Sequence, residues 1–310
     1  MIKKTSILIV IIILKSSFCT AQVQSDTTLI KTHLTKITKT AKARNYKNLE
    51  SLNNIAAYIL GVFQENTKQA YYQNFKVKGN TYKNVICSFG DPTNPKIIIG
   101  AHYDVCGDQE GADDNASGVA GLLELARLLK NNTKALKYHI ELVAYTLEEP
   151  PFFNTQQMGS YIHATSLKEN HTPVFGMISL EMIGYYSDKK DSQQYPIPAL
   201  SDLYGTKGDF ITVISPHKKG MFEKAFSTKF NALDHIKTVL FSSPVPIKST
   251  QLSDHLNYWN MGYDAVMITD TAFLRNKNYH TKADTMEKLD LLKIAKVIDS
   301  VYETIIILQD

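Results

Sequence analysis

The chain has 310 residues, of which 44% are hydrophobic and 21% are charged, and its formal net charge is +4. This length suits one large domain or two small ones with a sizeable core, and the ordinary composition excludes a disordered or collagen-like chain. No basic block with interleaved aromatic residues occurs, so nothing in the sequence supports a nucleic-acid partner.

The first 21 residues have the pattern of an export signal. Two lysines precede an apolar run over residues 7–14, and a stretch of small residues ends at Ala21. The run is too short for a stable membrane span, so we expect a signal peptide over residues 1–21 and a periplasmic or secreted protein; an uncleaved anchor is the alternative. Because this segment carries three lysines and no acid, its removal lowers the net charge from +4 to +1.

Hydrophobic periodicity predicts two amphipathic helices, over residues 28–41 and 49–64, followed by strand-like sequence at 71–78 and 84–89. Strands and helices then alternate. The further strands are expected at 97–101, 139–146, 174–180, 210–214 and 263–269. The further helices are expected at 117–131, 157–168, 219–230 and 290–308.

This alternation predicts an α/β fold with a mixed, mostly parallel central sheet sandwiched by helices. No linker divides the chain after the signal. We expect residues 22–79 to form N-terminal helices and a lead-in strand packed on a catalytic domain at 80–310. Residues 185–208 are polar and read as a long loop, which favours a functional role. Cys87 and Cys106 could form a disulfide in an exported protein, but two separate thiols are the favoured reading.

Side chains of the kinds that bind metals follow four of the predicted strands. His102 and Asp104 follow the strand at 97–101, and Glu148 and Glu149 follow the strand at 139–146. Glu181 closes the strand at 174–180, and His280 lies in the loop after 263–269. Since ligands of open α/β sheets bind at the carboxyl ends of the strands, we expect these side chains to form one site.

Asp113 and Asp114 add two acids to the same edge, between two glycines and just before the predicted helix at 117–131. An acidic helix cap is the alternative reading, because Asp and Asn favour that position. Capping accounts for one acid but not for two.

The charges indicate what fills the site. Three carboxylates, those of Asp114, Glu149 and Glu181, would raise one another's pKa if nothing lay between them, and two divalent cations would compensate them. Carboxylates and imidazoles suit Zn²⁺, and one bridging carboxylate can hold two ions about 3.5–4 Å apart. We therefore expect Asp114 to bridge two zinc ions, with His102 and Glu181 on one and Glu149 and His280 on the other.

Two neighbouring acids are assigned other roles. The carboxylate of Asp104 is placed to accept a hydrogen bond from the second ring nitrogen of His102; an ordinary solvated acid is the alternative. Glu148 precedes a ligand and is the expected general base, which would take the proton of the attacking water and pass it to the leaving amine. Taken alone, the Glu148–Glu149 pair would read as a solvated strand end.

The motifs together resemble metallopeptidase family twenty-eight, which includes bacterial leucyl aminopeptidases and aminopeptidase Y. They are found at residues 100–104, 111–118, 148–149, 181–182 and 279–281, and the resemblance covers about residues 80–308. It implies two zinc ions, peptide substrates with a free N-terminus, and hydrolysis by a metal-bound hydroxide. It also implies that Tyr279 polarises the substrate carbonyl, with a packed loop tyrosine as the alternative.

The chain departs from its relatives in two ways that bear on function. Some relatives carry Asp where Glu181 stands, and the segment at 150–158 is longer than in the best-known members, so it could wall the substrate pocket. Two other functions stay open: a glutaminyl cyclase with a single zinc ion, and a metal-free binding protein that keeps only the fold. The sequence does not indicate the oligomeric state or the preferred N-terminal residue.

Overall fold

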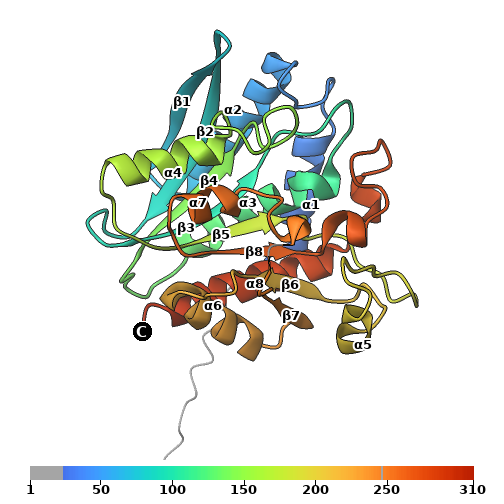
Figure 1. The fold of residues 1–310 in the computed structure, drawn as a ribbon. Helices are drawn as coiled ribbons and strands as arrows, with labels where there is room; N and C mark the ends of the chain where they lie inside the picture. The colour runs from blue at the N-terminus through green and yellow to red at the C-terminus, as the bar shows by residue number, and fades with distance from the viewer. Residues whose placement is uncertain (1–23, 246) are drawn as a thin grey trace, which may run out of the picture.

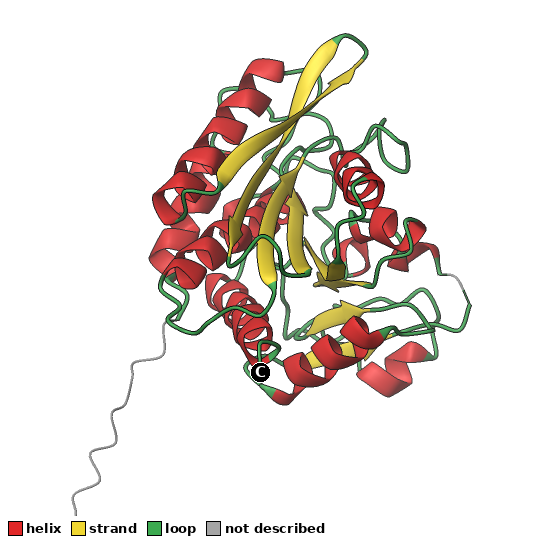
Figure 2. Ribbon diagram, turned by 90° about the vertical axis from the view of Figure 1, so that its left-hand side faces the viewer, coloured by secondary structure: helices red, strands yellow, loops and turns green. Residues whose placement is uncertain are grey.

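The computed structural model describes residues 24–245 and 247–310. In this part of the chain a twisted eight-stranded sheet lies between layers of helices, as Figure 1 and Figure 2 show. The expected signal peptide at residues 1–21 lies outside the described residues. Among the described helices, none is long and apolar enough to cross a membrane.

The sheet is mixed, with a parallel centre. Its order is β1-β2-β4-β3-β5-β8-β6-β7, in which β4, β3, β5 and β8 are mutually parallel. β1 and β2 extend one side in antiparallel pairing, and β6 joins β8 antiparallel on the other. The strands are β1 (Ala70–Val77), β2 (Asn80–Phe89), β3 (Lys96–His102), β4 (His139–Tyr145), β5 (Val174–Glu181), β6 (Ile211–Ile214), β7 (Thr238–Phe241) and β8 (Ala265–Thr269). The expected α/β fold is confirmed.

Helices cover both faces of this sheet, and the larger layer includes the two N-terminal helices. Its members are α1 (Thr27–Thr38), α2 (Leu49–Asn66), α3 (Gly118–Lys130), α6 (Met221–Ala232) and α8 (Leu291–Ile307). The opposite face is covered by α4 (Gly159–Glu169) and α7 (His255–Asn260). Short helical segments complete the chain: η1 (Ala112–Ser117), α5 (Leu200–Tyr204), η2 (Lys248–Thr250), η3 (Ala272–Leu274) and η4 (Met286–Lys288).

The apolar run of β3 shows why the sheet needs two covering layers. Ile97 and Ile99 belong to the larger hydrophobic cluster, whereas Ile98 belongs to the smaller cluster under α4 and α7. Successive side chains of a strand point to opposite faces, so a continuous apolar run must be buried on both sides.

The structure adds elements that hydrophobic periodicity did not predict. β7 is a four-residue strand, and α7 has six residues, so neither offers enough length for a periodic pattern. The predicted loop at 185–208 is interrupted by α5 near its end. Cys87 and Cys106 are separate free thiols, in agreement with the favoured reading.

The ring of Tyr145 on the neighbouring strand β4 leaves no space for a side chain at Gly100 in β3. A substitution at Gly100 therefore tests the packing of the sheet. A Cβ at Gly100 would lie 2.1 Å from Cε2 of Tyr145, whose hydroxyl is held by the hydroxyl of Tyr258 at 2.6 Å. We expect Gly100→Ala to lower the free energy of unfolding by about 1–3 kcal/mol, because overpacking forces the ring or the strand to shift. The measurement is the midpoint of urea unfolding.

Gly61→Ala is the matched control. Gly61 lies within α2, and a Cβ there meets no atom within 4 Å. This substitution should raise stability, by up to about 1 kcal/mol, since alanine favours a helix over glycine. Equal midpoints for the two variants would show that Tyr145 does not constrain Gly100.

Candidate metal centre

The side chains expected to form a site meet at the carboxyl edge of the parallel strands. His102 ends β3, and Glu181 ends β5, while the glutamate pair begins three residues after the end of β4. Asp114 comes from η1, and His280 comes from the loop after β8. Five of the six side chains are at most 6% exposed, and His280 is half-buried. The six are His102, Asp114, Glu148, Glu149, Glu181 and His280.

Asp114 occupies the centre of the cluster. Its Oδ1 lies 3.3 Å from Nε2 of His102, and its Oδ2 lies 3.1 Å from Nε2 of His280. Each imidazole also faces a glutamate: Glu181 Oε2 is 3.4 Å from His102, and Glu149 Oε2 is 3.2 Å from His280. The cluster therefore consists of two imidazole–carboxylate groups that share Asp114.

These separations fit zinc. Two ligand atoms bound at about 2.0 Å to one tetrahedral ion lie about 3.3 Å apart, and the four observed separations are 3.1, 3.2, 3.3 and 3.4 Å. In addition, Oδ2 of Asp114 and Nε2 of His280 are buried without a hydrogen-bond partner among the described residues. Buried polar atoms are normally partnered, so these atoms are arranged for a ligand such as a metal ion.

The electrostatics of the cluster lead to the same conclusion. Burial raises the pKa of Glu148 well above its ordinary value and, with the charge of Asp114, raises the pKa of Glu149 to about 8. Burial also acts to raise the pKa of Asp114, but the two imidazoles outweigh it and lower that pKa. With no cation present, the acids cannot all be ionised at neutral pH, whereas divalent cations would compensate their charges.

Backbone hydrogen bonds fix the segment that carries Asp114. The carboxylate of Asp284 accepts from the backbone N–H groups of Asp113 and Asp114, at 3.0 and 3.1 Å. Asp113 in turn accepts from the backbone of Gly184 and from the amide of Asn276, at 2.9 and 2.7 Å. The carboxylate of Asp113 therefore ties the segment before Asp114 to Gly184 and Asn276. It does not act as the helix cap that was the alternative reading.

Asp104 makes a different contact from the one expected. Its Oδ1 lies 3.7 Å from Nδ1 of His102, too far for a hydrogen bond, and that nitrogen instead faces the backbone oxygen of Asp104 at 3.2 Å. The carboxylate accepts from the backbone N–H groups of Glu148 and Glu149, at 3.2 and 3.1 Å. Two backbone amides hold this carboxylate, so Asp104 orients the glutamate pair, and its hydrogen bond to His102 comes from its backbone oxygen.

Three residues around the centre were not expected from the sequence. Ser253 donates from Oγ to Oε2 of Glu181 at 2.7 Å, and Asp284 holds the Asp114 segment. Arg44 is fully buried and donates to the backbone oxygens of Tyr103 and Gly111, at 2.8 and 2.6 Å, and also to that of Glu110. None of the three belongs to a strand-end pattern, so no local signal in the sequence indicates them.

Tyr279 stacks on the imidazole of His280, with ring centroids 3.7 Å apart and planes at 17°. Its ring lines the pocket over the metal centre, which has a volume of about 370 Å³. Of the segment at 150–158, Pro150 and Phe153 line this pocket as expected, whereas Phe152 is core.

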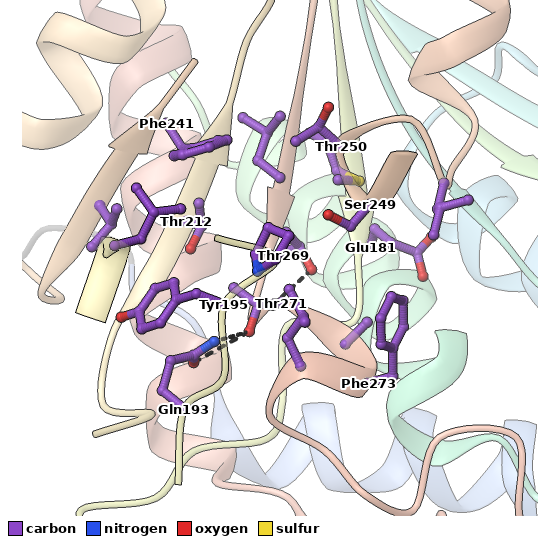
Figure 3. Close-up of a pocket in the computed structure, with 18 of the residues that line it drawn as sticks. Glu181, Gln193, Tyr195, Thr212, Phe241, Ser249, Thr250, Thr269, Thr271 and Phe273 are labelled. Atoms are coloured by element: carbon purple, nitrogen blue, oxygen red, sulfur yellow. Dashed lines mark hydrogen bonds between the residues drawn. The ribbon is translucent and has the colours of Figure 1, made fainter. Parts of the chain in front are cut away.

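An apolar pocket adjoins the metal centre, and Figure 3 shows it in close-up. The two cavities share Glu181, Leu252 and Tyr279. The apolar pocket has a volume of about 760 Å³ with its open mouth included, and its only charged lining residue among those described is Glu181. Apolar and aromatic side chains form most of its wall, including Leu200, Tyr204, Phe210, Ile214, Val239, Phe241 and Phe273.

Comparison with known sequences identifies relatives of the chain. A family model described as "Peptidase family M28" matches residues 84–305. An Escherichia coli protein named "Uncharacterized protein YfbL" is 44% identical over 86% of this chain and 83% of its own length. A Trichophyton verrucosum protein named "Probable leucine aminopeptidase" is 26% identical over 69% of this chain, and the chain spans 55% of that protein's length.

Solved structures share the fold. The LapA aminopeptidase of Legionella pneumophila superposes with a TM-score of 0.72 at 19% identity, over 92% of this chain and 72% of its own. Tannerella forsythia glutaminyl cyclase superposes with a TM-score of 0.64 at 17% identity, over 91% of this chain and 99% of its own. At such identities the likeness shows the fold alone.

The fold, the site and these matches define the class of protein: the chain is a peptidase, and thus a hydrolase. It belongs to peptidase family M28, since the matched region covers most of its length. The resemblance inferred from the sequence motifs is confirmed.

Arg44 comes from the segment before the matched region, and its replacement tests whether that segment supports the site. We expect Arg44→Met to lower the free energy of unfolding by about 3 kcal/mol, because it leaves buried carbonyl oxygens without a donor. It should also weaken zinc binding, because those carbonyls belong to the segment that leads to Asp114. Thermal unfolding and zinc titration measure the two effects.

Lys42→Met is the control, since Lys42 is exposed and two residues away. It removes the same charge from the same segment without removing a buried hydrogen bond. If both variants bound zinc as tightly as the wild type, the N-terminal segment would have no role in the metal centre.

Proposed function

We propose that this peptidase is an exported dizinc aminopeptidase, which removes single residues from the free N-terminus of peptides. The observation that carries the proposal is the pair of imidazole–carboxylate groups around Asp114, at the separations expected of zinc ligands. In this assignment Asp114 bridges two ions. His102 and Glu181 hold the first ion, and Glu149 and His280 hold the second.

A zinc pair, when bound, polarises the scissile carbonyl and lowers the pKa of water. The protein supplies the proton transfers. The Glu148 carboxylate lies 3.8 Å from His102, beside the ligands but outside the two groups that share Asp114. It accepts the proton of the attacking water and returns it to the leaving amine. Asp104 keeps this carboxylate in place through the backbone amides of the glutamate pair.

Substrate binding follows from the apolar pocket beside the centre. The buried side chains of Phe210, Ile214 and Val239 are part of its wall, so this part of the pocket lies inside the protein. A pocket of this kind next to the reacting carbonyl holds one side chain, which suits removal of the terminal residue. Glu181 of the centre lines this pocket, and its carboxylate attracts the ammonium group of the substrate. Tyr279 borders both cavities, and in this proposal its hydroxyl donates to the carbonyl oxygen.

Export is part of the proposal because of the basic and apolar segment at residues 1–21. A cyclase with one zinc ion is the second candidate, since glutaminyl cyclases are among the structures that share the fold. The second imidazole–carboxylate group, at His280 and Glu149, favours two ions over one.

Glu148→Gln tests the proton transfer. We expect this variant to keep its zinc and to lose about 10²–10⁴-fold in kcat, because the amide cannot accept a proton. Asp114→Ala should instead lose metal, since both groups depend on this carboxylate. Zinc content is measured by elemental analysis and kcat with a leucyl anilide. Glu169→Gln, an exposed position at the end of α4, is the control for the lost charge. Full turnover by Glu148→Gln would show that Glu148 is not the general base.

A substrate panel tests the pocket and the reaction together. We expect leucyl and phenylalanyl anilides to give values of kcat/KM at least about tenfold above those of aspartyl and lysyl anilides, because burying a charge in an apolar pocket is unfavourable. A chelator should abolish all turnover, and added zinc should restore it. Formation of pyroglutamate from N-terminal glutamine, with one zinc ion per chain and no anilide hydrolysis, would establish the cyclase instead.

A further inference from the structure

Cys106 lies at the edge of the metal centre, in the loop between β3 and η1. Its backbone N–H donates to Oε1 of Glu149 at 2.9 Å. Its Sγ, a carboxylate oxygen of Glu149 and a ring nitrogen of His280 all lie within 4.8 Å of one another. The thiol is half-buried and is not part of a disulfide, so it is free to take part in the chemistry of the site.

An independent observation concerns the polar atoms around His280. Oδ2 of Asp114 is buried, has no hydrogen-bond partner among the described residues, and lies 3.1 Å from Nε2 of His280. Nε2 of His280 is also without such a partner, although Glu149 lies 3.2 Å away. The imidazole of His280 thus lies close to oxygen atoms of Asp114 and Glu149 and within 4.8 Å of the sulfur of Cys106.

We propose that Cys106 is a fourth protein ligand of the ion held by Asp114, Glu149 and His280. This inference rests on the dizinc centre of the proposed function and adds to it a sulfur ligand. In a tetrahedral zinc site a sulfur at about 2.3 Å and an oxygen or nitrogen at about 2.0 Å lie about 3.5 Å apart. Sγ already lies within 4.8 Å of the ligand atoms of Glu149 and His280, so any remaining approach is short. The thiol loses its proton to solvent as the sulfur–metal bond forms.

The consequence is an unequal pair of ions. Four protein ligands close the coordination of the ion at Cys106, as in structural zinc sites. The other ion has three, from His102, Asp114 and Glu181, and keeps an open position for water or the substrate carbonyl. Glu148 faces His102 and thus lies beside the open ion, where the proton transfer takes place.

Cobalt substitution of the full-length protein tests the assignment without relying on turnover. After zinc is removed, cobalt(II) is added stepwise to two equivalents while the absorption spectrum is recorded. We expect a thiolate-to-cobalt charge-transfer band in the near ultraviolet in the wild type. Cys106→Ser should lose this band and bind one of the two cobalt ions at least about tenfold more weakly. Cys87→Ala, which removes the fully buried thiol of β2, should keep the band.

Alkylation gives a second readout on the wild type, in case the Cys106→Ser variant does not fold. With zinc bound, iodoacetamide should modify Cys106 at least tenfold more slowly than after chelation, as followed by mass spectrometry. Two cobalt ions bound with visible bands but no sulfur band would overturn the role of Cys106 and leave the dizinc peptidase intact. Failure to bind cobalt at all would overturn both. Alkylation at the same rate with and without zinc would also overturn the assignment.

Discussion

The main constraint on this structure is the electrostatic repulsion among several buried carboxylates that lie close together. Asp114, Glu149 and Glu181 lie close to two imidazoles with little access to water. In a medium of low polarizability like charges repel strongly, and burial together with the charge of Asp114 raises the pKa of Glu149 to about 8. Cations relieve this repulsion, so the geometry of the cluster and its charge have one common explanation. The unpartnered Oδ2 of Asp114 marks the point at which the compensation is needed.

The surrounding polar residues keep the ligands in position. Asp104 holds the amides of the Glu148–Glu149 turn, and Asp284 holds the amides that lead into Asp114. Arg44 holds carbonyl oxygens of the preceding loop, and Ser253 holds Glu181. These contacts hold a site whose ligands come from two strand ends, from η1 and from two loops. They also connect the N-terminal segment to the centre, because Arg44 lies outside the region matched to family M28.

The metal centre and the apolar pocket form one functional unit through their shared walls. Glu181 belongs to the centre and also lines the pocket, and Tyr279 does the same while stacking on His280. A substitution that moved Glu181 or Tyr279 in the pocket wall would therefore also shift a side chain of the metal centre. The pocket wall comes largely from the segment around α5 and from β6 and β7, which lie at the far side of the sheet from β1. In the proposed function, substrate preference would therefore depend largely on parts of the chain other than those that hold the ions.

The sequence by itself determined the α/β fold, the family and the residues that gather at the sheet edge. These follow from local patterns: alternating apolar runs, and acids or histidines at or just beyond the ends of strands, as His102 ends β3. Only the tertiary structure decided what each side chain touches. Asp104 lies two residues from His102, yet its carboxylate binds the amides of Glu148 and Glu149. Arg44, Ser253 and Cys106 reach the centre from loops without a periodic pattern. Such contacts depend on where distant loops meet in space, and no spacing in the sequence records that.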